Sequence, residues 1–184
     1  MTNYANEFNG AIARTKKFDL KIPKYSIDLA RRWLTSNSPK EIHDWFFTEF
    51  DTHSPVDLVP NRIELTRKMS MDPPSWLGCD VVYTIGWIDD RTPTGRFKFG
   101  DAEIENWLLN GGHIGRANLH VWLTLPSMEI VDLFLPSIFA VTENKPEISG
   151  GVIAGHADDV TRVAYKPMLI GDDFLKRSGI LYSE

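Results

Sequence analysis

Hydrophobic residues follow a helical period in the first part of the chain and a different period after residue 72. Apolar side chains spaced three and four positions apart predict amphipathic helices. The segment 15–25 carries charges and a proline, which indicates a connector. Four helices are predicted here: one capped by Thr2, one from Ser26 to Asn37, one from Ser38 to about Phe50, and one from Pro60 to Asp72.

The start of the third helix carries a clear local signal. Ser38-Pro39-Lys40-Glu41 matches a capping box, with serine as N-cap, proline at the first helical position and glutamate at the third. We therefore expect the Ser38 hydroxyl to accept a hydrogen bond from the first turn of this helix.

After residue 72, short apolar runs bounded by turn residues predict strands. The expected strands are 80–88, 96–99, two arms of a hairpin within 119–135, 137–142 and 160–165, with short helices at 101–110 and 172–178 and a loop at 143–160. Helices followed by mainly antiparallel strands predict an α+β fold in which N-terminal helices pack on a sheet. We expect a single domain over residues 1–184, with a helical part at about 1–72 and a sheet part at about 80–170.

Two polar residues interrupt the apolar hairpin at 119–135, namely His120 on the first arm and Asp132 on the second. Histidine suits proton transfer near neutral pH, and a carboxylate commonly orients its ring. A three-residue loop at 125–127 places His120 directly opposite Asp132, whereas a two-residue loop at 126–127 puts them on opposite faces. A structural ion pair, or an Asp132 that accepts backbone hydrogen bonds near the strand end, is the alternative.

Composition narrows the classes of function. A net charge of −5 and the absence of any basic run longer than two residues argue against a nucleic-acid surface. A single cysteine excludes an internal disulfide and a cysteine-rich metal site. No apolar run approaches the roughly 20 residues of a membrane span, and the N-terminus lacks a signal-peptide pattern. We therefore expect a cytoplasmic protein that contacts neither nucleic acid nor membrane and holds no cofactor, since the glycine-rich stretch at 150–155 matches no phosphate-binding motif.

The motifs of the second half have a recognisable order. Gly86-Trp87 ends one strand, His120-Val121-Trp122 lies on another, and Asp132 follows on the next. This order resembles the transglutaminase/papain-like cysteine hydrolase superfamily over about residues 55–140, although Leu133-Phe134 stands where many relatives have Pro-Thr. The resemblance implies a papain-like fold with His120 as base and Asp132 as its orienting residue. It also implies a nucleophilic cysteine at the start of the helix before the Gly-aromatic strand.

The expected nucleophile is missing from its place. The matching helix begins near Pro60-Asn61-Arg62, where Asn61 is the polar residue. The only thiol belongs to Cys79, 41 residues before His120, in a context that leads into a strand. A neighbouring carboxylate, Asp80, is expected to raise the pKa of this thiol rather than lower it. Cys79 is therefore either a small buried core residue or an unusual nucleophile.

Two functions follow from the resemblance. The first is a transglutaminase/papain-like domain without hydrolase activity that binds a protein or peptide. The second is an active cysteine hydrolase or acyltransferase in which Cys79 attacks, His120 acts as base and Asp132 orients it. Candidate binding residues are Trp122, Trp87 and Asn61, although aromatic residues in a sheet are more often part of the core.

A third hypothesis is a metal-dependent hydrolase. His113, His120 and His156 would supply imidazole ligands, and Asp158 and Asp159 would add carboxylates. The alternative is a solvated polar loop at these positions.

Overall fold

The computed structural model describes residues 3–50, 58–112 and 117–181. Within these ranges helices are mixed with a five-stranded sheet whose strand order is β4-β3-β2-β1-β5, which confirms the predicted α+β class. Among the described residues, every helix is too short or too polar to cross a lipid bilayer.

The chain divides into two compact units, each assembled from segments distant in sequence. Both units contain helices and strands, so their limits do not follow the expected helical and sheet parts. That residues 1–184 form a single domain stays a prediction. Unit 1 comprises residues 1–25, 82–121 and 157–184, and unit 2 comprises residues 26–81 and 122–156.

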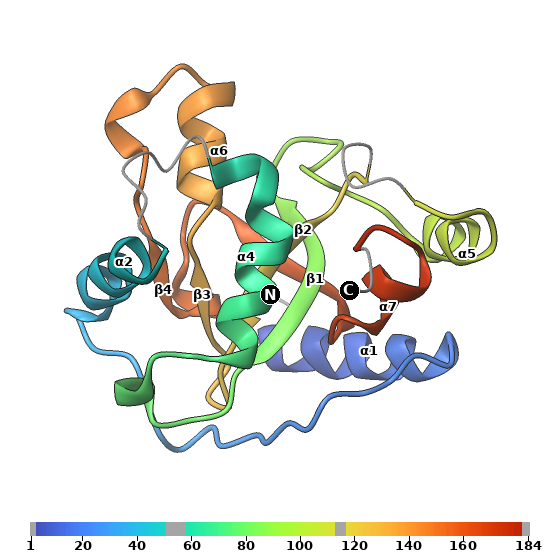
Figure 1. Ribbon diagram of the computed structural model, residues 1–184, viewed down its shortest axis with the longest axis horizontal. Helices are drawn as coiled ribbons and strands as arrows, with labels where there is room; N and C mark the ends of the chain where they lie inside the picture. Colours follow the sequence, from blue (N-terminus) through green and yellow to red (C-terminus); the bar gives the residue numbers. More distant parts are fainter. Residues whose placement is uncertain (1–2, 51–57, 113–116, 182–184) are drawn as a thin grey trace. The chain divides into compact units, whose positions relative to one another are not determined.

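Unit 1 is built on a pair of antiparallel strands covered by a helix. Helix α1 (Tyr4–Lys17) packs against strand β5 (Ala164–Ile170), which pairs with β1 (Val82–Asp89) (Figure 1). The side chain of Asn3 accepts a hydrogen bond from the Ala5 N–H and caps α1, whereas the predicted cap, Thr2, lies outside the described residues. The remaining elements of unit 1 are α5 (Asp101–Asn110), the 3₁₀ helix η4 (Ala157–Asp159) and α7 (Asp173–Arg177).

The edge strand β5 contains a proline and a bulge. Its pairing with β1 shifts between Ile85 and Gly86, so Gly86 faces Pro167 and Met168 is the extra residue. Proline has no backbone N–H to donate, and strands tolerate it at edges and bulges. Strand β5 corresponds to the strand predicted at 160–165 but lies further along the chain than expected.

Unit 2 places strand β3 between its two neighbours. Strand β2 (His120–Thr124) begins in unit 1, ends in unit 2 and pairs with β3 (Glu129–Asp132), which pairs in turn with β4 (Ile153–His156). Phe46 and Phe134 meet edge to face at 5.9 Å in the core of this unit. Its helices are α2 (Ser38–Glu49), α4 (Arg62–Met71) and α6 (Leu135–Thr142), with 3₁₀ helices η1 (Val59–Asn61), η2 (Ser75–Leu77) and η3 (Pro146–Ile148).

The capping-box prediction is correct for the helix and wrong for the cap. Helix α2 does begin at Ser38 and has proline in its first turn. However, the Ser38 hydroxyl accepts the backbone N–H of Thr35 at 2.9 Å, so it closes the preceding turn instead of capping α2. The backbone carbonyl of Asn37 receives the first helical N–H groups.

Two predicted elements in the first 100 residues are wrong. Residues 26–34 form no helix, because the N–H groups of Trp33 and Leu34 bond to the side chain of Glu129. Residues 96–99 form no strand beyond a bridge between Ile88 and Arg96, and the next backbone position has a positive φ.

Two further differences lie between residues 135 and 160. The segment predicted as a strand at 137–142 is helix α6, which has proline in its first turn. The apolar pattern of so short a run does not distinguish a strand from a helix. The start of α6 is fixed by Asp132, which lies outside the run. The predicted loop at 143–160 contains strand β4, whose residues are only half-buried.

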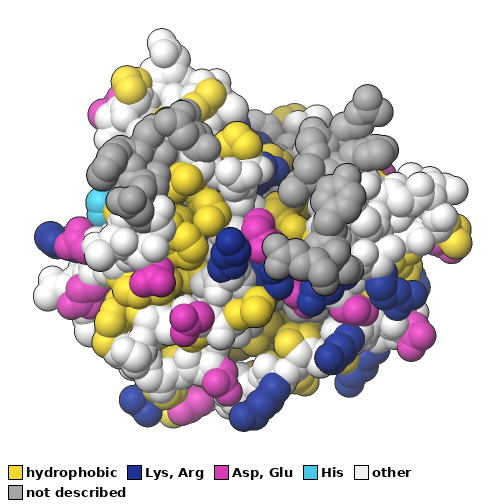
Figure 2. Space-filling model, viewed as in Figure 1, with side chains coloured by type: hydrophobic (Ala, Val, Ile, Leu, Met, Phe, Trp, Pro, Cys, Tyr) yellow, Lys and Arg dark blue, Asp and Glu magenta, His cyan; other side chains and the backbone are white. Residues whose placement is uncertain are grey.

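The surface of the chain mixes charged and apolar groups. On the face shown in Figure 2, acidic and basic side chains are interspersed and hydrophobic side chains lie among them. Single exposed apolar residues are common on protein surfaces. Within the described ranges, the large hydrophobic residues that remain exposed are Tyr25, Ile27, Leu29, Met71, Trp76, Leu109 and Val141.

Candidate functional site

The hairpin turn decides where His120 and Asp132 lie along their strands. Leu125 and Glu129 pair across the turn, and Met128 has φ of 64°. The loop is therefore Pro126-Ser127-Met128, a three-residue turn with a left-handed third residue. Both predicted loops are thus wrong, because Leu123 pairs with Val131, a register two residues away from that of a loop at 125–127.

Asp132 serves the backbone in this arrangement. In the observed register Asp132 falls opposite Trp122, so the expected direct pairing with His120 is wrong. Its carboxylate is 1% exposed and accepts hydrogen bonds from the N–H groups of Phe134 and Leu135 at 2.9 and 3.0 Å. Asp132 thereby starts helix α6 and places negative charge at its N-terminus. The predicted alternative, backbone hydrogen bonds near the strand end, is confirmed.

His120 belongs to unit 1 and is fully buried. Its ring stacks on Phe97, with ring centroids 5.3 Å apart and an interplanar angle of 19°. A general base must come within hydrogen-bond reach of the group that it deprotonates. In the described arrangement the imidazole is packed in the interior rather than presented to solvent.

Cys79 lies in unit 2 and lines a cleft, in contrast to the predicted buried core position. It follows the 3₁₀ helix η2 and Gly78, whose φ is 65°. Burial raises the pKa of the Cys79 thiol to about 11, and the charges of Glu129 and Asp80 add to this effect. The predicted influence of Asp80 is thus confirmed in direction.

A buried carboxylate organises the wall of this cleft. We call residues 26–35, which run without regular structure across the hairpin turn, the strap. Glu129 is 2% exposed and accepts hydrogen bonds from the N–H groups of Trp33 and Leu34 at 2.8 and 3.3 Å and from the Ser127 hydroxyl at 2.5 Å. Glu129 could not be recognised from the sequence, since the backbone N–H groups that it accepts lie about 95 residues away.

The strap is held at two further points. The N–H of Asp28 donates to the carbonyl of Pro126 at 2.9 Å, and the Arg32 guanidinium donates to the carbonyl of Ser127 at 3.2 Å. The Arg31 guanidinium lies 3.6 Å from the centre of the Trp33 ring, a cation–π geometry. Together these contacts fix the position of the Trp33 indole.

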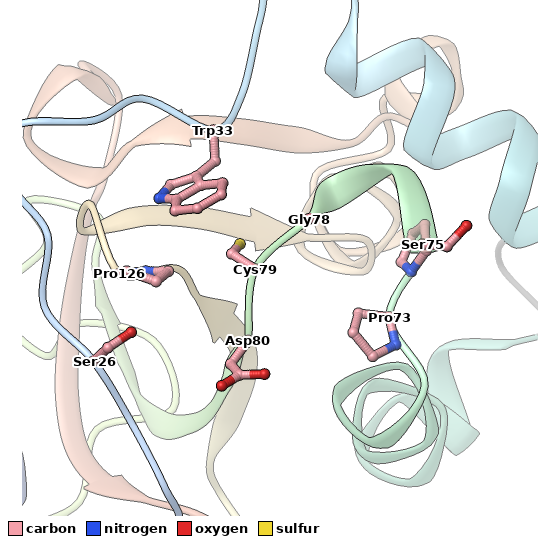
Figure 3. A pocket seen from close by; sticks show the side chains of 9 residues that line it. Ser26, Trp33, Pro73, Ser75, Gly78, Cys79, Asp80 and Pro126 are labelled. Atoms are coloured by element: carbon pink, nitrogen blue, oxygen red, sulfur yellow. The ribbon is translucent and has the colours of Figure 1, made fainter.

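The cleft itself has a volume of about 430 Å³ and is wide open to solvent. Figure 3 shows the Trp33 ring above Cys79, whose sulfur points toward it, with Pro126 beside them and Ser75 and Pro73 further along the cleft. The Trp33 indole N–H is buried and has no hydrogen-bond partner within the described ranges. The lining residues are Ser26, Trp33, Pro73, Pro74, Ser75, Gly78, Cys79, Asp80 and Pro126.

The three predicted binding residues do not line this cleft. Trp122 is fully buried, which makes it a core residue and corrects its proposed binding role. Trp87, in unit 1, carries the Lys98 ammonium 4.9 Å from its ring centre and packs so close to Gly95 that a Cβ there would lie 2.7 Å from the ring. Asn61 is exposed at the end of η1, directly before α4, and makes no side-chain cap.

The structure does not bring the described members of the predicted metal site together. His113 lies outside the described residues. His156 faces Glu129 in the pairing of β3 with β4, and Asp158 accepts the backbone N–H of Tyr4 at 2.9 Å. Within residues 3–50, 58–112 and 117–181, no three His, Cys, Asp or Glu side chains converge in a way that could hold a metal ion.

Comparison of the chain with protein-family models, with curated proteins and with solved structures finds no match. The resemblance to the transglutaminase/papain-like superfamily therefore stays a prediction.

Proposed function

We propose that the chain is a catalytically inactive domain of transglutaminase/papain-like type that binds an extended peptide in the cleft of unit 2. The observation that carries this proposal is the position of the Cys79 thiol, which is half-buried beside Asp80 and follows a 3₁₀ helix instead of starting an α-helix. With a pKa of about 11, roughly one thiol in 10⁴ is ionised near pH 7, and the thiolate is the nucleophilic form. Catalytic cysteines instead have a lowered pKa, supplied by a helix N-terminus or a nearby cation.

The other two members of the expected triad are used in the fold. The Asp132 carboxylate begins α6, and the His120 ring is packed against Phe97. These roles favour a domain that keeps the residues of a hydrolase motif without its reaction.

The lining of the cleft favours an extended, proline-containing peptide. Aromatic rings and prolines form grooves that accept polyproline II segments, because such peptides lose little entropy on binding. The ring of Trp33 offers a flat apolar surface on which a peptide proline can pack. Asp80 is the charged residue among those that line the cleft, so the peptide would carry a basic residue.

The loss of catalysis is tested by thiol labelling. We expect iodoacetamide to label Cys79 very slowly near pH 7, with a rate that keeps rising beyond about pH 10 and is unchanged by His120→Ala. Rapid labelling near neutral pH that His120→Ala abolishes would contradict the proposal and support the active hydrolase.

The binding role is tested by NMR with acetylated hexapeptides that contain a central Pro-Pro and a flanking Arg or Glu. The Trp33 indole resonance is assigned by its loss in Trp33→Phe, with Trp76→Phe as the matched control because Trp76 is exposed and does not line the cleft. We expect this resonance to shift saturably with the Arg peptide, more weakly with the Glu peptide, and without this preference in Asp80→Asn. No shift with either peptide would overturn the proposed binding.

A further inference from the structure

A second cleft lies wholly within unit 1 and has no part in the function proposed for unit 2. Its walls come from the first turn of α1, the end of β1, helix η4 and the start of β5. Its volume of about 660 Å³ falls within the roughly 300–1,000 Å³ of small-molecule sites. Because these segments meet only in the folded unit, the cleft is a product of its tertiary structure.

The floor of this cleft is apolar and closely packed. Tyr4, Val163 and Tyr165 line it and are 3%, 7% and 2% exposed, so most of each side chain is held in the core. Val160 and Ala164 add further apolar surface. Such a lining favours a ligand with an apolar body.

Some of the charged groups in the cleft are paired with each other. Lys166 donates to Glu7 at 2.7 Å, and both side chains are about one-fifth exposed (22% and 19%). This ion pair bridges β5 to α1 and adds no net charge. Asp158 accepts the backbone N–H of Tyr4 at the start of α1.

Arg91 and Asp89 supply further charge at the cleft. Arg91 has φ of 65°, its backbone N–H donates to Asp89 at 3.0 Å, and its guanidinium donates to the carbonyl of Thr161 at 2.5 Å. A guanidinium has five N–H groups. Those of Arg91 that Thr161 does not engage have no partner within the described part of the chain. The same cleft is therefore lined by guanidinium donors of the exposed Arg91 and by the carboxylate of Asp89.

We propose that the unit 1 cleft binds a small zwitterion with an apolar body, of which an apolar α-amino acid is the simplest example. The ligand carboxylate pairs with the Arg91 guanidinium, whose fork of donors matches carboxylate geometry. The ligand ammonium faces the carboxylate of Asp89. The apolar body lies on the floor formed around Val163 and Tyr165. No bond is made or broken in this event.

Three probes with one common side chain test the charge requirement. L-Phenylalanine carries both charges, N-acetyl-L-phenylalanine lacks the cation, and L-phenylalaninamide lacks the anion. The last two also mimic the C-terminal and N-terminal residues of a peptide, so the set separates a free amino acid from a peptide end. We expect L-phenylalanine to shift the amide resonances of Val163 and Ala164 saturably, and each single-charge probe to bind at least about tenfold more weakly.

A matched pair of variants tests the role of Arg91. Arg91→Gln is expected to weaken the binding of L-phenylalanine at least about tenfold. The binding of L-phenylalaninamide should stay nearly unchanged, because this probe has no free carboxylate. Arg162→Gln is the control, since Arg162 is exposed and does not line the cleft. The proposal is overturned if no probe gives a saturable shift, if a single-charge probe binds as tightly as L-phenylalanine, or if both variants have the same effect. None of these outcomes bears on peptide binding in unit 2.

Discussion

The clefts of units 1 and 2 are supported by two different kinds of polar interaction. In unit 2 a buried carboxylate, Glu129, bonds to backbone N–H groups of the strap. In unit 1 the partly exposed pair of Glu7 with Lys166 joins two elements. Removing a partner from a buried hydrogen-bonded group leaves costly unsatisfied donors, whereas exposed ion pairs contribute little and are screened by salt. This difference predicts that single substitutions of polar residues lower the free energy of unfolding more in unit 2 than in unit 1.

The largest effect is expected for Glu129→Ala. This change leaves the N–H groups of Trp33 and Leu34 and the Ser127 hydroxyl without their acceptor. We expect the free energy of unfolding to fall by about 3 kcal/mol, measured by urea denaturation. The control is Glu49→Ala at an exposed position, expected to stay within about 0.5 kcal/mol. If Glu129→Ala lowered the free energy of unfolding by less than about 1 kcal/mol, the buried carboxylate would contribute no more than an exposed ion pair, and the proposed difference between the two units would be wrong.

The second effect concerns Asp132, the other buried carboxylate that bonds to the backbone in unit 2. Asp132→Ala removes the acceptor for the first N–H groups of α6. We expect a loss of about 1–2 kcal/mol by the same measurement, as for other helix caps. Asp132→Asn keeps an acceptor oxygen and should lose clearly less. Equal losses in the two variants would show that the charge, and not the hydrogen bonding, matters.

A third prediction links the buried carboxylate to the thiol in the cleft. The charge of Glu129 helps to raise the pKa of Cys79, after burial itself. Glu129→Gln should therefore lower that pKa and speed alkylation near pH 9, by less than about tenfold because burial remains. The pH profile of iodoacetamide labelling measures the change. An unchanged profile would leave burial and the charge of Asp80 as the causes of the raised pKa.

The smallest effect is expected in unit 1, at an ion pair between α1 and α5. Hydrogen bonds from Lys17 and Arg14 to Asp101, 2.6 and 2.8 Å long, lower the pKa of this carboxyl below its usual value. Because the folded pKa is the lower one, the stabilisation is present above about pH 4 and is lost as pH falls through the folded value. The carboxylate is 43% exposed, so the contribution stays below about 1 kcal/mol.

Asp101→Asn measures this contribution. The variant should be less stable than the parent near pH 7 and match it near pH 2, and the difference should shrink in about 1 M salt. A difference that persists at low pH would assign the effect to helix α5 itself, which Asp101 begins.

Local patterns in the sequence predicted much of the secondary structure. The apolar spacing around Phe8 and the stop signal at Pro73-Pro74 predicted α1 and the end of α4, and the run before Pro126 predicted β2. These signals act over one or two turns, where the chain's own periodicity decides the outcome.

Two of the failures have causes that lie outside the segment whose pattern was used. The strap has a helical pattern, but its N–H groups are taken by Glu129 on a strand about 95 residues later. Likewise, the capping oxygen of α6 belongs to Asp132, outside the apolar run that was predicted as a strand. The thiol pKa of Cys79 could be predicted in direction from its neighbour Asp80. Its main causes, burial and Glu129, depend on the tertiary structure.

Strand β5 carries a consequence for how the chain behaves at high concentration. It is the last strand of the sheet, and an open edge is a template on which another chain can add a strand. The bulge opposite Ile85–Gly86 interrupts the even spacing of backbone groups, and Pro167 removes a donor from the strand. Helix α1 also takes part of this edge, because the Ile170 N–H donates to the Thr15 hydroxyl. A second chain laid along the edge would find no continuous ladder of hydrogen bonds, so we expect the bulge, Pro167 and α1 together to disfavour edge-to-edge aggregation.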